Sequence, residues 1–170
     1  MEEPSSIVIA DTSVLINFLA IDRMDLIERY PCRFLITEHV RREVSDHYEE
    51  QLTRLKSALA QRMLEEIVIN HPEEMGLFGQ LAQLARFGDG ECACLAVALH
   101  RNYILAIDDK KAIKQAYLLR PTLSIITTEN LIVLMIKLGL LTVEEADAIK
   151  KEWALYHRFK LNILSFRDHL

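Results

Sequence analysis

Short apolar runs alternate along the chain with longer segments in which apolar residues recur every three or four positions. The short runs are rich in β-branched residues, which is typical of strands buried on both faces; they span residues 7–10, 33–37, 66–70, 103–107 and 123–127. The segments between them predict helices at 12–20, 22–28, 38–47, 49–64, 73–85, 91–100, 110–119, 129–138 and from 142 onward. This alternation predicts an α/β fold with three layers, α/β/α, built on a parallel sheet.

Several helix boundaries carry residues suited to satisfying free backbone groups. Asp22 and Thr37 each precede a predicted helix and are expected N-caps. Thr142 and Glu145 have the spacing of a capping box at the start of the last helix. Gly139 is expected to close the helix at 129–138.

The composition is that of an ordinary globular protein, with 51% hydrophobic and 26% charged residues in a chain of 170. We interpret residues 1–170 as a single domain with a helical extension from about residue 140, because neither a repeat nor a linker interrupts it. The net charge of −5 argues against a protein that coats nucleic acid, so basic contact surfaces should be local. The three cysteines lack the spacing of a disulfide framework, and no apolar run reaches the ~20 residues of a membrane span. We therefore expect a cytoplasmic protein.

Acidic residues recur where the predicted strands end and the next helices begin. Asp11 directly follows the first strand, and Asp108 and Asp109 follow the fourth. Glu43 lies on the helix after the second strand, and Glu91 in the first turn of a helix. These positions meet at the carboxyl edge of a parallel sheet, where such folds bind ligands. Carboxylates in one crevice repel one another unless hard cations such as Mg²⁺ or Mn²⁺ bind them. Two such ions can cleave a phosphodiester, with Asp11, Glu91, Asp108 and Asp109 as expected ligands.

Each of these acids also has a simpler interpretation. Asp11 alone is equally well explained as the N-cap of the following helix. Glu43 can belong to a solvated helix face, and Glu91 can stabilise a helix N-terminus through the dipole. The Asp108-Asp109 pair can combine helix capping with charge pairing to the lysines that follow. The metal hypothesis therefore depends on all the acids converging.

Smaller polar residues accompany the acids. The hydroxyls of Thr12 and Ser13 are expected to orient a carboxylate or contact phosphate, or else to share the capping of the helix. Asn17, about one turn further on, offers a neutral polar contact to substrate. The simplest interpretation of Gly88 and Gly90 is that they supply positive φ for the turn at 87–90.

Four segments in this order resemble the PIN-domain family, and within it the toxin-like nucleases of the VapC type; they are IVIADTSVLINF (7–18), ITEHVRREV (36–44), GDGECACLAVAL (88–99) and LAIDDKKAIKQA (105–116). The resemblance implies a five-stranded sheet in the order 3-2-1-4-5 and an endoribonuclease activity that depends on Mg²⁺ or Mn²⁺. It places Asp11, Glu43 and Glu91 on the family's first three acidic positions. The fourth position falls on Asp108 or Asp109.

The resemblance also bears on substrate contacts. It makes Thr12 or Ser13 the hydroxyl residue that supports the first aspartate, and Asp89 an additional or outer acid. Relatives with the aspartate doublet often carry Arg four or five residues later, where this chain has Ile113 followed by Lys114. The basic residues nearest in sequence to the acids are candidates for phosphate contacts or, equally, for a solvated face; they are Arg41, Arg42, Lys110, Lys111 and Lys114.

The expected partners are an RNA substrate and, by resemblance, an antitoxin protein and a second copy of the chain. The apolar helix at 131–138 and the segment carrying Trp153, Tyr156 and Phe159 are candidate interfaces or core, and we favour core for the helix.

Two rival functions follow from the same residues. A haloacid-dehalogenase-like phosphatase also has an Asp after the first strand, but needs a second Asp where Ser13 stands. A catalytically weak PIN-like module would bind RNA or protein without cutting. Cleavage of RNA that depends on Asp11 and on divalent metal separates both from the nuclease.

Overall fold

The computed structural model describes residues 6–84 and 86–170 of the chain. The predicted helix end at Ala85 lies outside the described residues. Five strands form one parallel sheet in the order β3-β2-β1-β4-β5; they are β1 (Ile7–Ala10), β2 (Arg33–Thr37), β3 (Glu65–Ile67), β4 (Ile104–Ala106) and β5 (Ile125–Ile126). The predicted α/β class, parallel pairing and strand order are thereby confirmed.

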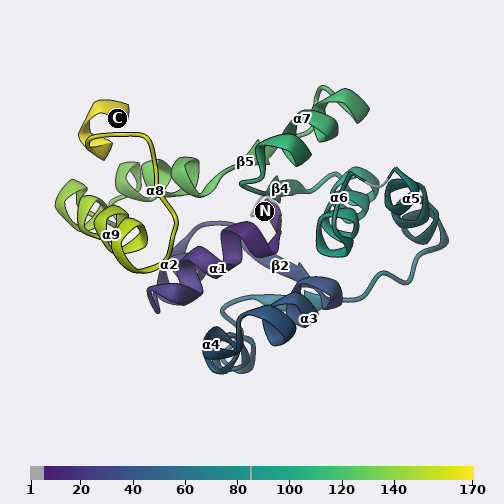
Figure 1. Cartoon of the computed structure of the whole chain (residues 1–170), viewed down its shortest axis with the longest axis horizontal. Coiled ribbons are helices and arrows are strands. Elements are labelled where there is room, and N and C mark those ends of the chain that lie inside the picture. The colour runs from purple at the N-terminus through teal and green to yellow at the C-terminus, as the bar shows by residue number, and fades with distance from the viewer. Residues whose placement is uncertain (1–5, 85) are drawn as a thin grey trace, which may run out of the picture.

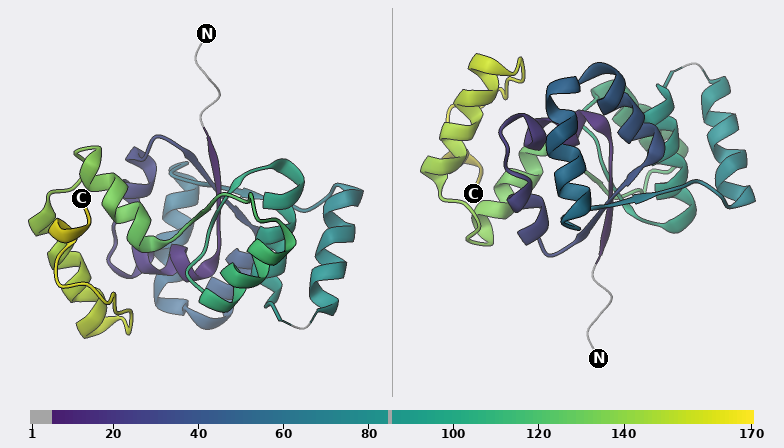
Figure 2. Two further views of the ribbon diagram at one scale, coloured as in Figure 1. Left: turned by 90° about the horizontal axis from the view of Figure 1, so that it is seen from above. Right: turned by 90° about the horizontal axis from the view of Figure 1, so that it is seen from below.

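Helices surround the sheet, as Figure 1 shows; they are α1 (Thr12–Ala20), α2 (Met24–Arg29), α3 (Glu38–His47), α4 (Glu49–Ala60), α5 (Pro72–Gln83), α6 (Asp89–Arg101), α7 (Lys110–Leu119), α8 (Thr128–Lys137), α9 (Val143–Tyr156) and a 3₁₀ helix η1 (Phe166–His169). In that view α1, α2, α8 and α9 lie to one side of the sheet, and α5 and α6 to the other. Helix α6 packs directly against β1, β2 and β4. Figure 2 shows α9 and the C-terminal segment at the opposite end of the molecule from α5.

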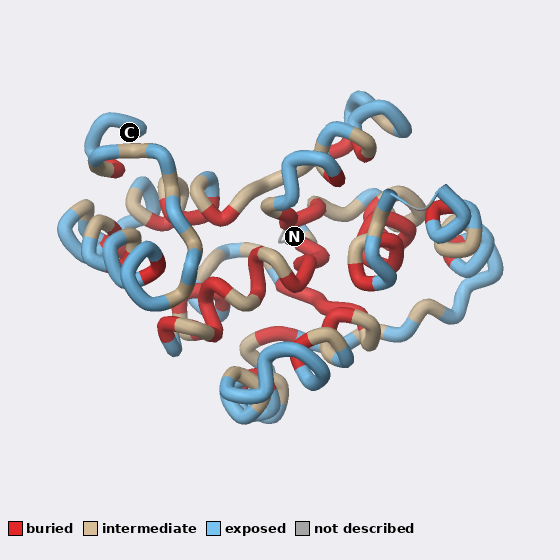
Figure 3. The backbone as a smooth tube through the Cα atoms, in the orientation of Figure 1, coloured by how far each residue is buried: buried red, intermediate tan, exposed pale blue. Residues whose placement is uncertain are grey.

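The core is built from β1 and its neighbours together with α6, whose turns are buried in Figure 3. The run from Cys92 to Ala98 is fully or almost fully buried, which explains its small apolar side chains. Cys94 donates from Sγ to the carbonyl oxygen of Ala10 at 3.5 Å, so this thiol fastens α6 to the end of β1. Burial raises the pKa of Cys92 to about 11, as suits a core residue rather than a reactive thiol.

Most of the predicted caps are confirmed, and one is wrong. Thr37 and Thr142 accept backbone N–H bonds at the starts of α3 and α9, and Gly139 has φ +76° after α8. Asp22, however, does not cap α2: it has φ +54°, and its N–H donates to the carbonyl of Leu19. Asp22 therefore ends α1, because a short polar side chain tolerates the left-handed conformation of a helix terminus.

The outer strands are shorter than the apolar runs predicted. Only Ile125 and Ile126 of the run at 123–127 form β5, which pairs with β4 over two residues at the edge of the sheet. The apolar helix α8 is core, as favoured from the sequence, since Leu131 and Ile132 are buried. Among the described helices, none is long and apolar enough to cross a membrane.

The C-terminal region packs back onto the sheet layers through specific bonds. Trp153 on α9 is fully buried and donates from Nε1 to the carbonyl of Asn17 at 2.8 Å. Asp147 accepts from Ser165 Oγ at 2.7 Å and from the Phe166 N–H at 2.9 Å. These contacts hold the irregular segment after α9 beside the end of α1, which becomes important for the site.

Candidate active site

Asp11 lies at the end of the central strand and has two distinct carboxylate oxygens. Oδ2 accepts from the Ser13 N–H at 3.1 Å and from Ser13 Oγ at 2.6 Å, so this oxygen caps α1. Oδ1 is buried and has no hydrogen-bond partner among the described residues. Burial raises the pKa of Asp11 from 3.8 to about 6, against the bonds from Ser13, and the nearby charge of Glu43 adds to the rise. One carboxylate oxygen of Asp11 thus caps α1, and the other is buried, poorly solvated and free to bind a cation.

Glu43 is held by two donors from distant parts of the chain. Its Oε2 accepts from Thr12 Oγ1 at 2.6 Å, and its Oε1 accepts from the Gly90 N–H at 3.0 Å. A Cβ atom at position 90 would lie 2.5 Å from Oε1 of Glu43. The expectation that Gly88 and Gly90 supply positive φ is wrong, since among the described glycines only Gly139 has it. Gly90 is instead required because the backbone approaches the carboxylate so closely.

Glu91 follows Gly90 in the first turn of α6. Its Oε1 accepts from the Gly88 N–H at 3.1 Å, so it caps the helix on which it stands. Burial raises the pKa of Glu91, and repulsion from Asp11, Asp109 and Glu43 raises it further. Such mutual repulsion is the electrostatic consequence of several carboxylates sharing one crevice.

The two members of the aspartate doublet have different surroundings. Asp108 is enclosed by donors: Oδ1 accepts from the Thr128 N–H at 2.8 Å, and Oδ2 from Thr128 Oγ1 at 2.6 Å and Asn17 Nδ2 at 3.0 Å. Burial raises the pKa of Asp108 although these bonds oppose the rise. Asp109 is exposed and caps α7 by accepting from the Ala112 N–H at 2.8 Å.

A cleft of about 230 Å³ brings most of the predicted residues together; it is lined by Asp11, Thr12, Ser13, Glu43, His47, Tyr48, Glu91 and Asp109. Four carboxylates from four separate stretches of sequence therefore face one space at the carboxyl edge of the sheet. His47 and Tyr48 were not anticipated. A signal for His47 did exist, because it stands four residues after Glu43 and so on the same face of α3.

Other predicted residues lie outside this cleft. Asn17 is buried and bonds to Asp108 and Thr128, so it positions neighbouring side chains. Lys110 lines an adjacent pocket that also contains Asp108. Arg41 is paired with Glu66, and Arg42 with Glu38 at 3.2 Å; the remaining candidates outside the cleft, all exposed, are Asp89, Lys111 and Lys114.

The segment after α9 forms a wall beside the acids that the sequence did not reveal. His157, Arg158 and Phe159 line a pocket of about 580 Å³ together with Asp108 and Asp109. Lys160 and Phe159 line a second pocket, of about 390 Å³, with Asp108 and Lys110. The residues carry no periodic pattern, so only their tertiary position brings them to the site.

The donor set of the cleft suits a hard divalent cation. Carboxylate oxygens are the ligands that Mg²⁺ and Mn²⁺ favour. The unpartnered, buried Oδ1 of Asp11 is the atom that most needs a cation, since an ionised oxygen without partner or water is costly. Asp11, Glu43, Glu91 and Asp109 line this one cleft, although among the described residues no three of these carboxylates bring an oxygen each within 4.8 Å of the other two.

Fold and cleft together define an α/β protein with a carboxylate cluster at the carboxyl end of its central parallel strands. A family model described as PIN domain matches residues 7–152, so the chain belongs to the PIN-domain family. This membership removes the support for a haloacid-dehalogenase-like phosphatase. Among curated proteins, no relative of the chain was found.

A solved structure agrees with the fold. VapBC2 from Rickettsia felis, determined bound to a DNA fragment from the VapBC2 promoter, matches with a TM-score of 0.51 and 17% identity over 71% of this chain and 98% of that one. PAE2754 from Pyrobaculum aerophilum has a TM-score of 0.48 and 18% identity, covering 80% of this chain and 98% of its own. At such identities the first likeness bears on fold alone.

Proposed function

We propose that the protein is an endoribonuclease that hydrolyses RNA phosphodiesters with Mg²⁺ or Mn²⁺ held by the carboxylate cleft. The observation that carries the proposal is the buried, unpartnered Oδ1 of Asp11 in a cleft lined by three further carboxylates. Membership of the PIN-domain family supports a nuclease. A bound divalent ion would stabilise the negative charge that develops on the phosphate and make water more acidic.

The surrounding residues have definite roles in this proposal. Ser13 fixes the second oxygen of Asp11, and Thr12 with Gly90 fixes both oxygens of Glu43, so hydrogen bonds set the orientation of these two carboxylates. Asp109 completes the ligand set, while Asp108 anchors the end of β4 to α8 through Thr128. Water attacks phosphorus, the bond to the leaving oxygen breaks, and that oxygen gains a proton.

The direct test is cleavage of single-stranded and structured RNA with Mg²⁺, with Mn²⁺ and with EDTA. We expect that EDTA stops cleavage and that Asp11→Asn lowers it at least about 100-fold. Replacing a residue that only orients a metal ligand already costs up to about 100-fold, so loss of a ligand should cost at least as much. Asp168→Asn is the matched control, because this exposed aspartate lies in η1. Cleavage that survives EDTA or Asp11→Asn would overturn the proposal. Metal-independent RNA binding without cleavage would favour the PIN-like binding module.

The basic wall after α9 is the proposed contact surface for the RNA backbone. One pocket is lined by Arg158 together with Asp108 and Asp109. A second pocket is lined by Lys110 and Lys160 together with Asp108. These basic side chains attract the RNA backbone locally, although the net charge of −5 repels RNA over the molecule as a whole. In this proposal they replace the arginine that relatives with the aspartate doublet often carry at the position of Ile113 or Lys114.

This contact surface is testable through salt dependence. Each phosphate contact to a single strand contributes a slope of about 0.7 in log K against log salt. The double variant Arg158→Gln, Lys160→Gln should therefore lower the slope by about 1.4, whereas Lys137→Gln on α8 should leave it unchanged. Equal slopes for all three proteins would contradict the assignment.

We also place the protein, within this proposal, as the toxin of a toxin–antitoxin pair. Its resemblance to VapC-type nucleases and its fold likeness to VapBC2 support this role. Expression of the wild type should arrest growth, and co-expression of the product of an adjacent small gene should restore it. Arrest by Asp11→Asn equal to that by the wild type would contradict a role through cleavage.

Exposed Leu118 and Tyr156 offer apolar surface to a second copy, which sedimentation would detect.

A further inference from the structure

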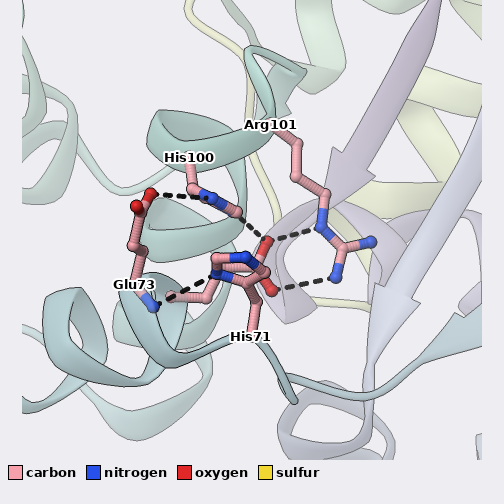
Figure 4. A network of polar contacts seen from close by, with 5 residues as sticks. His71, Glu73, His100 and Arg101 are labelled. Carbon is pink, nitrogen blue, oxygen red and sulfur yellow. Dashed lines mark hydrogen bonds and ion pairs between the residues drawn. The ribbon is translucent and has the colours of Figure 1, made fainter.

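A second cluster of metal-ligating side chains lies where α5 begins and α6 ends, apart from the carboxylate cleft. Figure 4 shows His71 and Glu73 at the start of α5 facing His100 near the end of α6. One potential ligand atom from each of the three residues lies within 4.8 Å of the other two. The rings of His71 and His100 are stacked at a tilt of 32° with centroids 4.5 Å apart.

His100 is oriented by a buried carboxylate behind it. Glu74 is fully buried, and Arg101 binds both of its oxygens, so it is ionised and can only accept. His100 Nδ1 lies 2.9 Å from Glu74 Oε2 and must therefore carry a proton. A carboxylate that receives the far N–H of a histidine is the usual support of a metal-binding imidazole, because it leaves Nε2 free and makes it more basic.

The free nitrogen of His100 faces a second acceptor. Nε2 lies 3.1 Å from Oε2 of exposed Glu73, and two lone pairs at that distance require a cation between them. A proton would suffice for this pair alone. Two tetrahedral ligands of one zinc ion lie about 3.3 Å apart at the usual bond lengths, so the same spacing also suits zinc.

His71 argues for the metal rather than the proton. Its Nδ1 accepts from the Glu73 N–H at 3.2 Å, so the ring is uncharged, and one of its nitrogens lies within 4.8 Å of the ligand atoms of Glu73 and His100. An additional proton on His100 does not use this third ligand, whereas a metal ion does. Coordination gives up the cap bond, and the freed N–H of exposed Glu73 can turn to water.

We propose that His71, Glu73 and His100 form a Zn²⁺ site that fastens the start of α5 to the end of α6, with Glu74 orienting His100. Two imidazoles and one carboxylate suit zinc better than Mg²⁺, and the fourth position remains for water. Helix α5 packs principally against α6, so a metal link at its first turn stabilises the attachment of this peripheral helix.

The test begins with metal-free protein dialysed against Zn²⁺ in excess Mg²⁺, which is added to compete for the carboxylate cleft. We expect the wild type to bind zinc at least about 100-fold more tightly than His71→Asn, Glu73→Gln or His100→Asn. Asn at position 71 keeps a capping side chain, and Glu73 is exposed, so neither variant should unfold. His169→Asn removes a different exposed histidine and should bind zinc as the wild type does.

Three further readouts identify the site. Co²⁺ should give the visible absorption of a tetrahedral complex in the wild type and in Asp11→Asn, but not in Glu73→Gln. Zinc should slow hydrogen exchange of the α5 amides and raise the melting temperature in the wild type and in His169→Asn, but not in Glu73→Gln. Unchanged zinc affinity in Glu73→Gln and His71→Asn would overturn the proposal and leave an ion-pair network. Because RNA cleavage is not the readout, this result is independent of the proposed nuclease activity.

Discussion

Replacing Asp11 by Asn should stabilise the metal-free protein while it abolishes cleavage. The structure gives the reason, since Asn retains an oxygen that can accept from Ser13 and cap α1. The substitution removes the negative charge that burial disfavours at the unpartnered Oδ1 and puts a neutral amide group there. A carboxylate site that binds a cation is expected to destabilise the folded protein when the cation is absent.

The magnitude follows from the pKa of Asp11, which is raised from 3.8 to about 6. The difference, at about 1.4 kcal/mol per pKa unit, corresponds to about 3 kcal/mol. Between these two values the folded state binds more protons than the unfolded state, so the free energy of unfolding decreases as the pH rises. The cost is absent below about 3.8 and complete above about 6. The new buried amide lacks a partner, which costs about 1–3 kcal/mol, so the net gain in Asp11→Asn should be about 0–2 kcal/mol at pH 8.

The assay is urea unfolding of wild type, Asp11→Asn and Asp168→Asn between pH 4 and 8 in EDTA. We expect the advantage of Asp11→Asn to grow from pH 4 to pH 6 and then stay constant. Asp168→Asn should show no such trend. Added Mn²⁺ should stabilise the wild type and reverse the order of stability. An Asp11→Asn protein that is less stable than the wild type at pH 8 in EDTA would refute the reasoning.

Two other predictions concern residues around the cleft. Asp109→Asn should lower RNA cleavage at least about 100-fold with little change in stability. Asp108→Asn should instead lose about 1–3 kcal/mol of stability, because its bonds to Thr128 are weakened. The reverse pattern in cleavage and urea unfolding would exchange the roles of the two aspartates. Gly90→Ala should displace Glu43, 2.5 Å from the new Cβ, and reduce cleavage about 10–100-fold without unfolding α6. Full activity of Gly90→Ala would show that Glu43 need not stay in place.

The acids that converge could be predicted because parallel strands impose a simple geometry. Asp11 follows β1 and Asp109 lies just beyond β4, two neighbouring strands, and their carboxyl ends meet at one edge of the sheet. Glu43 lies midway along α3 and Glu91 in the first turn of α6, and both helices begin at that edge, so their convergence also followed from the order of elements. The alternative interpretation of Asp11 as a helix cap proved compatible with its place in the cleft, because each oxygen has a different environment.

Tertiary neighbours decided what the sequence could not. The proposed choice of Asp109 over Asp108 as a metal ligand depends on Thr128, twenty residues further on, whose N–H and hydroxyl bind Asp108. The need for Gly90 depends on Glu43, 47 residues away. A turn rich in glycine suggests positive φ when only local sequence is visible, whereas here the constraint is close approach.

The segment after α9 was the least predictable part of the site. It has no hydrophobic period, and its position follows from the burial of Trp153 and from the bonds of Asp147 to Ser165 and Phe166. Basic residues near the acids in sequence, such as Arg41, pair with other acids instead. Residues distant in sequence, such as Arg158, occupy the neighbouring pocket.

The most direct test of the central claim is an anomalous difference map from crystals of the wild type soaked in Mn²⁺. We expect a peak in the cleft about 2.1 Å from Oδ1 of Asp11, a hard-ion bond length, with Glu43, Glu91 or Asp109 beside it. The peak should vanish in Asp11→Asn crystals treated in the same way. A cleft without manganese, or an ion bound by Asp108 and not by Asp11, would contradict the account.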